Sequence, residues 1–538
     1  MREKTVQSRK VQRFAQTNGA IIAAAFAFVF PFFIYILSLR YYDYTYGFNV
    51  LAAQYALWTR HSFSLGTVNN PIGSPIIPNV DTILYNGNYY NAYAPGLAII
   101  SLPFSIVGFV LDGGKLLPQG NAIIMLELFV ALTGALACLL AYKICLMYSG
   151  KRLTSLIISF ALAFATSAWP FASVTFPHDT TMFLATAAAY CAIYYFRRNS
   201  KIVFLVLAGL CLGIVSILDY VAAILVVPLS IYVIAGIVIS RRSVAVDDSP
   251  AHSKRVPGLA FIPFLATFLI TGPLTVLAYN DAIFGSPLKF SEEYYKYVTP
   301  GQTNLTGLAA RFHFSALPEQ MIFNLFSPYR GLLVLSPILI LGFYGLYLMI
   351  RAYEYKADGL LFLGLFLSIF VPYSAWSDWA GGASYGPRFL VTALPFLVIP
   401  MFILWSKANH QKSREILLGL VFFLLFAIGA ITQGLGALTT ATPPVIWPPQ
   451  PLVYQLTAYA IPDLMKGQVG PWFLYKEKLI DHPAADIAVV VLIIGLLLAV
   501  ECYLVIRNIR IREESAEPLV HSEPQAIDQR SDVIVPED

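Results

Sequence analysis

The sequence predicts an all-α protein that crosses the membrane about twelve times, and three observations support this fold class. Of the 538 residues, 58% are hydrophobic and only 12% are charged, about half the charged fraction of a soluble domain. The mean hydropathy is +0.68, and apolar runs of roughly 20 residues recur along the chain, as transmembrane helices require. These runs do not alternate as the strands of a β-barrel would. This composition excludes a soluble enzyme, a nucleic-acid-binding protein and a disordered chain.

The predicted spans are the apolar runs long enough to cross a bilayer. The first is too long for the core of a signal peptide and is interpreted as a retained helix. The spans are expected at about 19–39, 121–147, 153–171, 180–196, 202–218, 221–239, 257–279, 331–350, 359–375, 389–405, 415–433 and 485–506.

A thirteenth apolar run, 96–111, decides the topology. If it crossed the membrane, the basic pairs at 151–152, 197–198 and 241–242 would all face outside. If it lies flat in the interface, they face the cytoplasm, as the positive-inside rule favours. With that choice both termini are cytoplasmic, and 24 of the 35 lysines and arginines lie inside against 11 outside. We therefore expect interfacial helices in the first outer loop.

This topology divides a multi-pass protein of the cell membrane into four regions, with most of the polar chain and the expected active site on the extracytoplasmic face. The regions are a basic cytoplasmic N-terminus at 1–18, a catalytic transmembrane region at 19–405 with outer loops 40–120 and 280–330, C-terminal transmembrane helices at 406–506 with a Pro-rich, irregular outer loop at 434–484, and an acidic, disordered cytoplasmic tail at 507–538.

The cysteines do not indicate a metal or disulfide site. All five lie inside apolar runs, and no CxxC spacing occurs, so they are expected to behave as small hydrophobic residues.

An acid follows the first predicted span directly. Asp43 lies among tyrosines in the segment 40–44, where a partly desolvated carboxylate is a candidate general base for a hydroxyl acceptor. The alternative is a helix-end acid that pairs with Arg40.

Two further outer turns carry acids. His178 and Asp179 precede the span at 180–196, where they are expected to bind an acceptor, a phosphate or a metal, or else Asp179 simply caps the helix. Asp219 and Tyr220 are the only polar break within 202–239. Because basic pairs flank that stretch on both sides, the break must lie at the outer boundary, as a ligand-binding pair or as a hairpin turn.

The segment 376–388 is the best candidate for an anion site. Gly381 and Gly382 allow a close backbone approach, Tyr385 adds an aromatic ring, and Arg388 begins the next helix, whose N-terminus also favours an anion. The alternatives are a tight turn and an arginine that snorkels to lipid headgroups. Arg330 repeats the arrangement before the run at 331–350, with interfacial anchoring as its alternative.

Several short motifs on the predicted outer side occur in an order typical of one family. With the acid after the first span and the interfacial helix, they resemble the C-type (GT-C) polytopic glycosyltransferases, and among these the dolichyl-phosphate-mannose protein mannosyltransferases and RgtA-like proteins. The motifs are Gly-Asn-Tyr-Tyr-x-x-Tyr-Ala-Pro-Gly-Leu at 87–97, Phe176-Pro177-His178, Leu218-Asp219-Tyr220, Tyr279-Asn280, Phe284-Gly285-Ser286-Pro287, Ser-Pro-Tyr-Arg-Gly at 327–331 and Trp-x-Gly-Gly-x-Ser-Tyr-Gly-Pro-Arg at 379–388.

The resemblance implies transfer of mannose or another hexose or pentose from a polyprenyl-phosphate donor to a hydroxyl of a protein, glycan or lipid. It implies that Asp43 is the base, with Asp179 as substitute, and that His178 and Asp179 line the acceptor side. Arg388, with Arg330 as second candidate, would hold the donor phosphate. No nucleotide-binding fold is required, and no cofactor is indicated by a motif; a divalent cation such as Mg²⁺ or Mn²⁺ is compatible with the site.

Two other functions fit a polytopic membrane protein. A transporter or lipid-linked sugar flippase predicts acids or arginines buried in mid-span, together with internal repeats, and no repeat is found. An inactive relative that acts as an assembly subunit would bind the lipid phosphate without turnover.

Overall fold

The computed structural model describes residues 2–40, 45–72, 77, 79, 81–246, 258–294, 311–408, 411–439, 452–471 and 483–516. Helices predominate throughout these residues, and the predicted polytopic helical fold is confirmed. In the first half of the chain the helices are α1 (Arg2–Leu37), α2 (Thr45–Arg60), α3 (Gly96–Ile100), α4 (Leu102–Leu111), α5 (Asn121–Ser149), α6 (Arg152–Phe164), α7 (Ala168–Ala172), α8 (His178–Arg197), α9 (Val203–Leu218), the 3-10 helix η1 (Val221–Leu225) and α10 (Val226–Val246).

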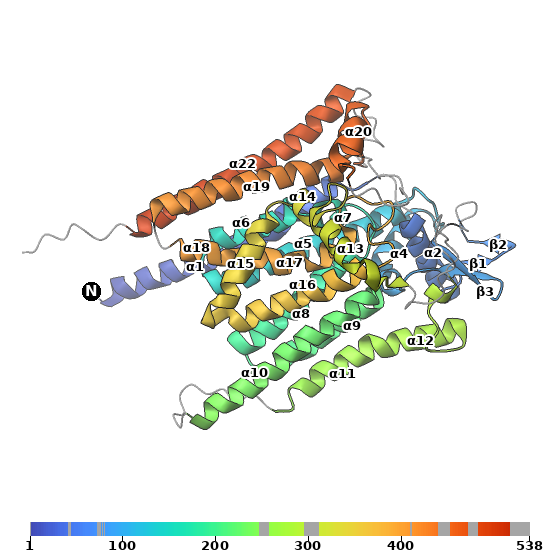
Figure 1. The fold of residues 1–538 in the computed structure, drawn as a ribbon, viewed down its shortest axis with the longest axis horizontal. Coiled ribbons are helices and arrows are strands. Elements are labelled where there is room, and N and C mark those ends of the chain that lie inside the picture. The colour runs from blue at the N-terminus through green and yellow to red at the C-terminus, as the bar shows by residue number, and fades with distance from the viewer. Residues whose placement is uncertain are drawn as a thin grey trace, which may run out of the picture.

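The second half continues the same architecture, with the long helices roughly parallel to one another (Figure 1). Its elements are α11 (Phe261–Thr271), α12 (Pro273–Phe284), η2 (Ser291–Glu293), η4 (Phe314–Ala316), α13 (Leu317–Phe326), α14 (Leu332–Leu335), α15 (Leu339–Arg351), η5 (Tyr353–Tyr355), α16 (Lys356–Ala375), η6 (Arg388–Ala393), α17 (Leu394–Val398), η7 (Ile399–Met401), α18 (Phe402–Lys407), α19 (Lys412–Leu438), the π-helix η8 (Leu456–Ala460), α20 (Ile461–Met465) and α22 (Pro483–Ala516).

Eight of the predicted spans are confirmed as helices long and apolar enough to cross a membrane. They are 19–37, 121–149, 221–240, 261–284, 353–375, 388–407, 412–438 and 487–511. Three others, α6, α9 and α15, are shorter apolar helices, and α8 coincides with the remaining predicted span. The total of twelve crossings stays a prediction.

Prolines and glycines interrupt several of the predicted spans. The run at 257–279 becomes α11 and α12, with a break at Gly272–Pro273, and extends to Phe284. The run at 331–350 breaks around Pro337 into α14 and α15. Proline lacks the N–H that would continue the helical ladder, which accounts for the position of these breaks.

The described parts of the outer loops hold more regular structure than predicted. The loop at 434–484 was expected to be irregular, but its residues 456–465 form η8 and α20. Helix α22 continues to Ala516, so the predicted tail at 507–538 begins as helix, and 517–538 lie outside the described residues.

The first outer loop contains a small antiparallel sheet that the all-α prediction missed. Its strands are β1 (Gly66–Thr67), β2 (Asn70–Pro71), β3 (Thr82–Tyr85) and β4 (Asn88–Asn91), in the order β2-β1-β4-β3. Asn86 and Gly87 connect β3 to β4 with φ angles of +47° and +77°, as a type I′ hairpin turn requires. Strands of two and four residues are too short for an alternation signal, which is why only the turn was predictable.

The predicted interfacial helix is α3 followed by α4. With ten residues, α4 is about 15 Å long at 1.5 Å per residue, roughly half the hydrocarbon thickness. It packs against α5.

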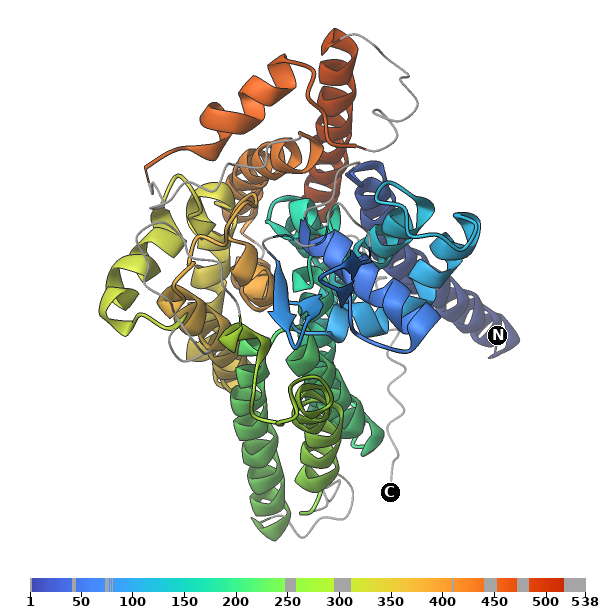
Figure 2. The same ribbon diagram turned by 90° about the vertical axis from the view of Figure 1, so that its right-hand side faces the viewer.

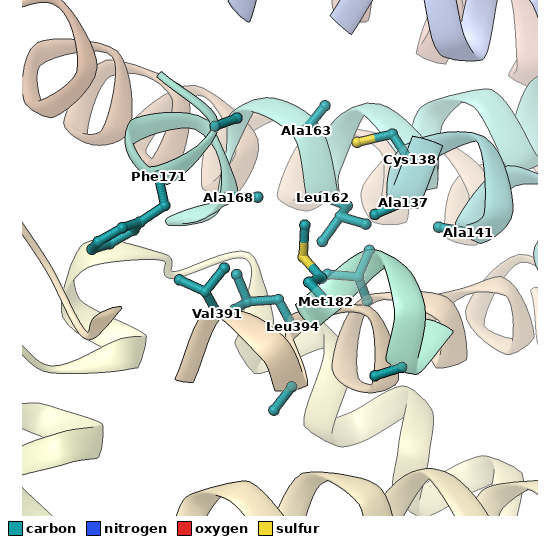
Figure 3. Close-up of a cluster of buried hydrophobic side chains, with 14 of the residues drawn as sticks. Ala137, Cys138, Ala141, Leu162, Ala163, Ala168, Phe171, Met182, Val391 and Leu394 are labelled. Carbon is teal, nitrogen blue, oxygen red and sulfur yellow. The ribbon is translucent and has the colours of Figure 1, made fainter. Parts of the chain in front are cut away.

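The centre of the bundle is formed by α5, α6, α8 and the segment from η6 to α17. Figure 3 shows buried apolar side chains meeting there, including the small Ala137 and Ala141 of α5 and Ala163 of α6, together with Met182 of α8. Small residues let apolar helices approach closely in a membrane, where van der Waals packing replaces the hydrophobic effect. The result is a rigid base for the loops at one end.

The two ends of the bundle differ in chemistry. The sheet and α2 lie at one end (Figures 1 and 2). At the other end the Arg197 guanidinium pairs with the buried Asp358 carboxylate, which also accepts from the Tyr232 hydroxyl at 2.6 Å. This ion pair joins α8, α10 and α16.

Candidate functional site

The candidate site lies at the sheet-bearing end, where several helices begin or stop. Helix α9 ends at Leu218 and α16 at Ala375, whereas α8 begins at His178 and η6 at Arg388. Because these helices run alternately up and down the bundle, residues far apart in sequence meet at one end (Figure 1). His178, Asp219 and Asp378 all interact electrostatically with Arg388.

The loop between α16 and η6 is folded around two glycines in the left-handed region. Gly381 and Gly382 have φ angles of +75° and +59°, a conformation that costs other residues energy. Asp378 forms the turn: its carbonyl accepts from Gly381 N–H at 2.9 Å and its Oδ1 accepts from Gly382 N–H at 3.2 Å. Burial raises the pKa of the Asp378 carboxyl, an effect that the nearby Arg388 opposes.

Arg330 stabilises this loop through hydrogen bonds to its backbone and to Ser384. Its side chain is fully buried, and its guanidinium donates to the carbonyls of Ala380 and Gly382 and to the Ser384 hydroxyl, the last two at 2.6 and 2.8 Å. It also donates to the Tyr329 hydroxyl at 3.1 Å. Arg330 therefore has most of its donors occupied by the protein.

Arg388 is bound quite differently. Its guanidinium lies over the rings of Phe176 and Phe389, at 5.2 and 4.7 Å from their centroids. Its stem crosses Gly381, where an added Cβ would come within 2.9 Å of Arg388 Cγ. Within the described part of the chain no hydrogen bond is recorded for this guanidinium, and its Nε is buried without a partner. Arg388 is thus a positioned cation with its donors available.

His178 lies beside Arg388 at the start of α8, and Asp179 is the next residue of that helix. The His178 ring packs against Phe176 and Phe389, with centroids 6.0 and 5.7 Å apart, and its Nδ1 has no partner among the described residues. The Asp179 carboxylate is fully buried, and neither oxygen has a hydrogen-bond partner in the described structure. Asp179 faces Gly134 of α5, whose ideal Cβ would be 3.2 Å from Oδ1. It does not cap α8 with its side chain.

Asp219 also lies near Arg388, and its carboxylate is well satisfied. Its Oδ1 accepts from the N–H groups of Val221 and Ala222 at 3.0 and 3.3 Å, and its Oδ2 accepts from the Tyr373 hydroxyl. The Tyr373 ring in turn stacks on Phe389 at 4.4 Å. Burial raises the pKa of the Asp219 carboxyl, and the Tyr373 hydrogen bond opposes the shift.

Two residues predicted to contact a ligand, Tyr220 and Tyr385, contact other parts of the protein. Tyr220 packs edge-on against Phe290 at 5.4 Å. The Tyr385 hydroxyl donates to the Thr432 carbonyl at 2.8 Å, and its ring packs with Leu456 and Ala460. The Tyr385 side chain therefore attaches the glycine loop to α19 and the segment that follows it.

The predicted base, Asp43, lies outside the described residues, but the chain on both sides of it is placed. The Arg40 N–H donates to the Ser173 carbonyl at 3.2 Å. The Tyr46 ring stacks on Phe176 at 5.5 Å. Both contacts are to the turn that precedes His178, so the chain approaches and leaves the 41–44 segment at this turn.

Thr45, next to the same segment, is fixed by an acid of the sheet region. The Asp81 carboxylate accepts from the Thr45 hydroxyl and, at 2.7 Å, from the Tyr93 hydroxyl.

A metal site is not formed by the described side chains alone. No group of three His, Cys, Asp or Glu residues in the described ranges could hold an ion. Asp179, with two unpartnered oxygens, is the residue that fits a divalent cation best.

Sequence reasoning missed three residues of this cluster. Asp378 precedes Gly-Gly by the Asp-x-x-Gly spacing of a turn that its side chain can close. Phe176 and Phe389 each adjoin a predicted site position, but an aromatic beside an apolar run looks like core. Their partner, Arg388, comes from a segment more than 200 residues away from Phe176.

The comparisons with known proteins agree with the predicted resemblance. Residues 107–280 match the sequence profile of the dolichyl-phosphate-mannose-protein mannosyltransferase family, which confirms that resemblance over this part of the chain. The matched region includes His178, Asp179, Asp219 and Tyr220. No curated protein matches the chain.

Two solved membrane proteins are similar in structure. ArnT from Cupriavidus metallidurans, bound to undecaprenyl phosphate, is 13% identical; the match covers 91% of this chain and 78% of that protein, with a TM-score of 0.45. The oligosaccharyltransferase of Archaeoglobus fulgidus in its apo form is 11% identical; the match covers 76% of this chain and 56% of that one, with a TM-score of 0.43.

Proposed function

We propose that this chain, with a mannosyltransferase-family region at 107–280, is an integral-membrane glycosyltransferase that uses a polyprenyl-phosphate-linked sugar. The observation that carries the proposal is Arg388, a cation held between two aromatic rings with no hydrogen bond recorded in the described structure. The family's name supports mannose as the sugar, and the acceptor is a hydroxyl of a protein, glycan or lipid.

The position of Arg388 suits the phosphate of such a donor. A guanidinium has five N–H donors in a plane and binds phosphate oxygens in pairs. The rings of Phe176 and Phe389 hold it by cation–π contact without using those donors. When the sugar leaves, negative charge develops on the phosphate, and a preorganised cation stabilises that charge in the transition state.

We assign the base to one of two acids. Asp43 is our first candidate, since its neighbours Arg40 and Tyr46 contact the turn before His178, and Asp179 is the second. The carboxylate accepts the acceptor hydroxyl proton, the acceptor oxygen forms a bond to the anomeric carbon, and the bond from that carbon to the phosphate oxygen breaks. The products are the glycoside, polyprenyl phosphate and one proton.

The proposed orientation places the chemistry on the extracytoplasmic face of the cell membrane. The opposite end of the bundle carries the basic last turns of α8 and α15, with Arg197 and Arg351, and basic residues favour the cytoplasmic side. A lipid-anchored donor is reached from the bilayer, so no soluble nucleotide-sugar site is needed.

The test measures sugar transfer by the purified chain placed in membranes, with polyprenyl-phosphate mannose as the donor. Arg388→Ala, Asp43→Asn and Asp179→Asn should each lower transfer, Arg388→Ala by about 10²-fold or more, the cost of removing one transition-state donor. Arg351→Ala is the matched control, because Arg351 also lies over an aromatic ring, Tyr347, at 5.5 Å, but at the other end of the bundle. Full activity in Arg388→Ala contradicts the assignment.

One observation favours a second candidate, a lipid-linked sugar flippase. Glu501 lies within the 487–511 span of α22, is fully buried, and has two carboxylate oxygens without a partner among the described residues. A buried mid-span acid is the feature expected of a transport pathway. Movement of a lipid-linked sugar across vesicles, without transfer and abolished by Glu501→Gln, would favour this candidate.

A further inference from the structure

Asp378 places a carboxyl group in the loop beside the proposed phosphate site. Its Oδ1 accepts from Gly382 N–H at 3.2 Å, and its Oδ2 lies 3.5 Å from the ideal Cβ position of Gly382. The neighbouring Gly381 carries the stem of Arg388, with its ideal Cβ 2.9–3.1 Å from three Arg388 atoms. The Asp378 carboxylate and the Arg388 side chain therefore lie against adjacent glycines, Gly382 and Gly381, of one tight loop.

The two groups interact without forming an ion pair. They affect each other electrostatically, but the one ion pair of 4.0 Å or less recorded between described residues joins Arg197 and Asp358. Asp378 thus lowers the positive potential around Arg388 and leaves its N–H donors available. A simple phosphate-binding site would not gain from an acid at this position.

The proposed reaction changes the charge of the ligand at this site. The donor is a phosphodiester with one negative charge. After the bond between the sugar and the phosphate oxygen breaks, polyprenyl phosphate is a monoester with a charge of about −1.5 to −2 at pH 7. The proton released from the acceptor hydroxyl balances this gain in negative charge. An enzyme that holds the donor by its charge therefore holds its product more tightly.

We propose that Asp378 weakens the binding of the phosphate-monoester product more than that of the phosphodiester donor, and so promotes product release. This inference rests on the proposed function. Asp378 is a specificity residue here, because it acts through Arg388 to distinguish the singly charged phosphodiester donor from the more highly charged monoester product. Arg330 does not serve this purpose, since its donors are engaged by the loop carbonyls.

The size of the effect follows from Coulomb's law. One additional ligand charge at roughly 6 Å from the carboxylate, with an effective dielectric constant between 40 and 80, corresponds to about three- to tenfold in affinity. The donor, with one charge fewer, experiences about half of the total repulsion.

The experiment compares Asp378→Asn with the wild type in the transfer assay. The asparagine Oδ1 can still accept from Gly382 N–H, so the turn is preserved while the charge is removed. We measure KM for polyprenyl-phosphate mannose and the inhibition constants of polyprenyl phosphate and of its methyl phosphodiester. The inhibition constant of the monoester should fall about three- to tenfold more than that of the diester, and kcat should fall when release limits turnover.

Two further variants make the result specific. Asp378→Glu keeps the charge and should keep the wild-type ratio of the two inhibition constants, even if the longer side chain disturbs the loop and shifts both. Asp281→Asn is the matched control, the same exchange at an exposed position of α12. A loop disturbed only structurally would shift both constants together.

The outcomes separate the two proposals. Wild-type protein that transfers no sugar overturns the proposed function and with it this inference. Wild-type transfer with equal changes of both inhibition constants in Asp378→Asn, or with no change in either, overturns the inference alone. If Asp378→Asn does not fold, the Asp378→Glu ratio decides, because a glutamate that abolishes the preference would refute the role of charge.

Discussion

Gly381→Ala should displace Arg388 without unfolding the protein. The substitution places a Cβ 2.9 Å from Arg388 Cγ and 3.0 Å from its Nε, closer than carbon atoms normally approach. The atoms in the way belong to a flexible side chain rather than to backbone, so Arg388 moves while the loop stays. Its guanidinium then leaves the position between Phe176 and Phe389.

The Gly381→Ala substitution has two energetic costs that must be separated. The first is the backbone strain of a non-glycine residue at a φ angle of +75°, about 1–2 kcal/mol. The second is the loss of the Arg388 cation–π contacts, about 0.5–2 kcal/mol, together with its alignment toward the phosphate. Gly87→Ala carries only the first, because Gly87 has a φ angle of +77° and nothing within 4 Å of its ideal Cβ.

The assay is therefore a comparison of the two alanine variants. Both should lose similar stability, measured as Tm in detergent. Only Gly381→Ala should raise KM for the polyprenyl-phosphate donor and lower kcat/KM, by about tenfold or more. If both variants transfer sugar equally well, Arg388 does not need its observed position, and the reasoning is refuted.

Three other changes test separate parts of the structure. Asp358→Ala should cost roughly 2–3 kcal/mol, less than a fully buried pair because 28% of Arg197 is exposed; unchanged Tm would contradict this. Burial raises the pKa of Asp378, so the folded state holds this proton more tightly, and its stability contribution is lost as pH rises through that pKa; Asp378→Asn should flatten the dependence of Tm on pH. Glu501→Leu should keep transfer activity and raise Tm, whereas lost transfer would assign Glu501 a functional role.

The span positions could be predicted from sequence because they depend on local composition. Apolar runs such as 121–149 and 412–438 satisfy the length requirement on their own. The interruptions were harder, although Gly272–Pro273 and Pro337 are visible in the sequence. A proline in an apolar run is compatible with either a kinked span or two short helices, and only packing decides between them.

Part of the candidate site could be proposed from sequence, for a similar reason. Arg388 and His178 could be singled out because charged residues at the ends of spans are few. The distinction between Arg388 and Arg330 could not be predicted, since both precede an apolar run after a Pro- or Gly-containing turn. Arg330 differs only through its bonds to carbonyls some 50 residues later, and such contacts leave no pattern in the sequence.

These two arginines suggest how a chain with few charges could position the phosphate of the proposed donor. Burying a guanidinium requires that its donors be satisfied, and Arg330 satisfies its terminal N–H groups largely with the carbonyls of the glycine loop. The loop that it stabilises carries Gly381 and Asp378, which set the path of the Arg388 stem and the potential around its head. Arg388 is then positioned by rings, which satisfy its charge in part and leave its N–H groups for a ligand. Arg330, bound by carbonyls, and Arg388, bound by aromatic rings, are therefore complementary. Arg330 makes the loop rigid, and this rigidity leaves the Arg388 N–H groups available for a ligand.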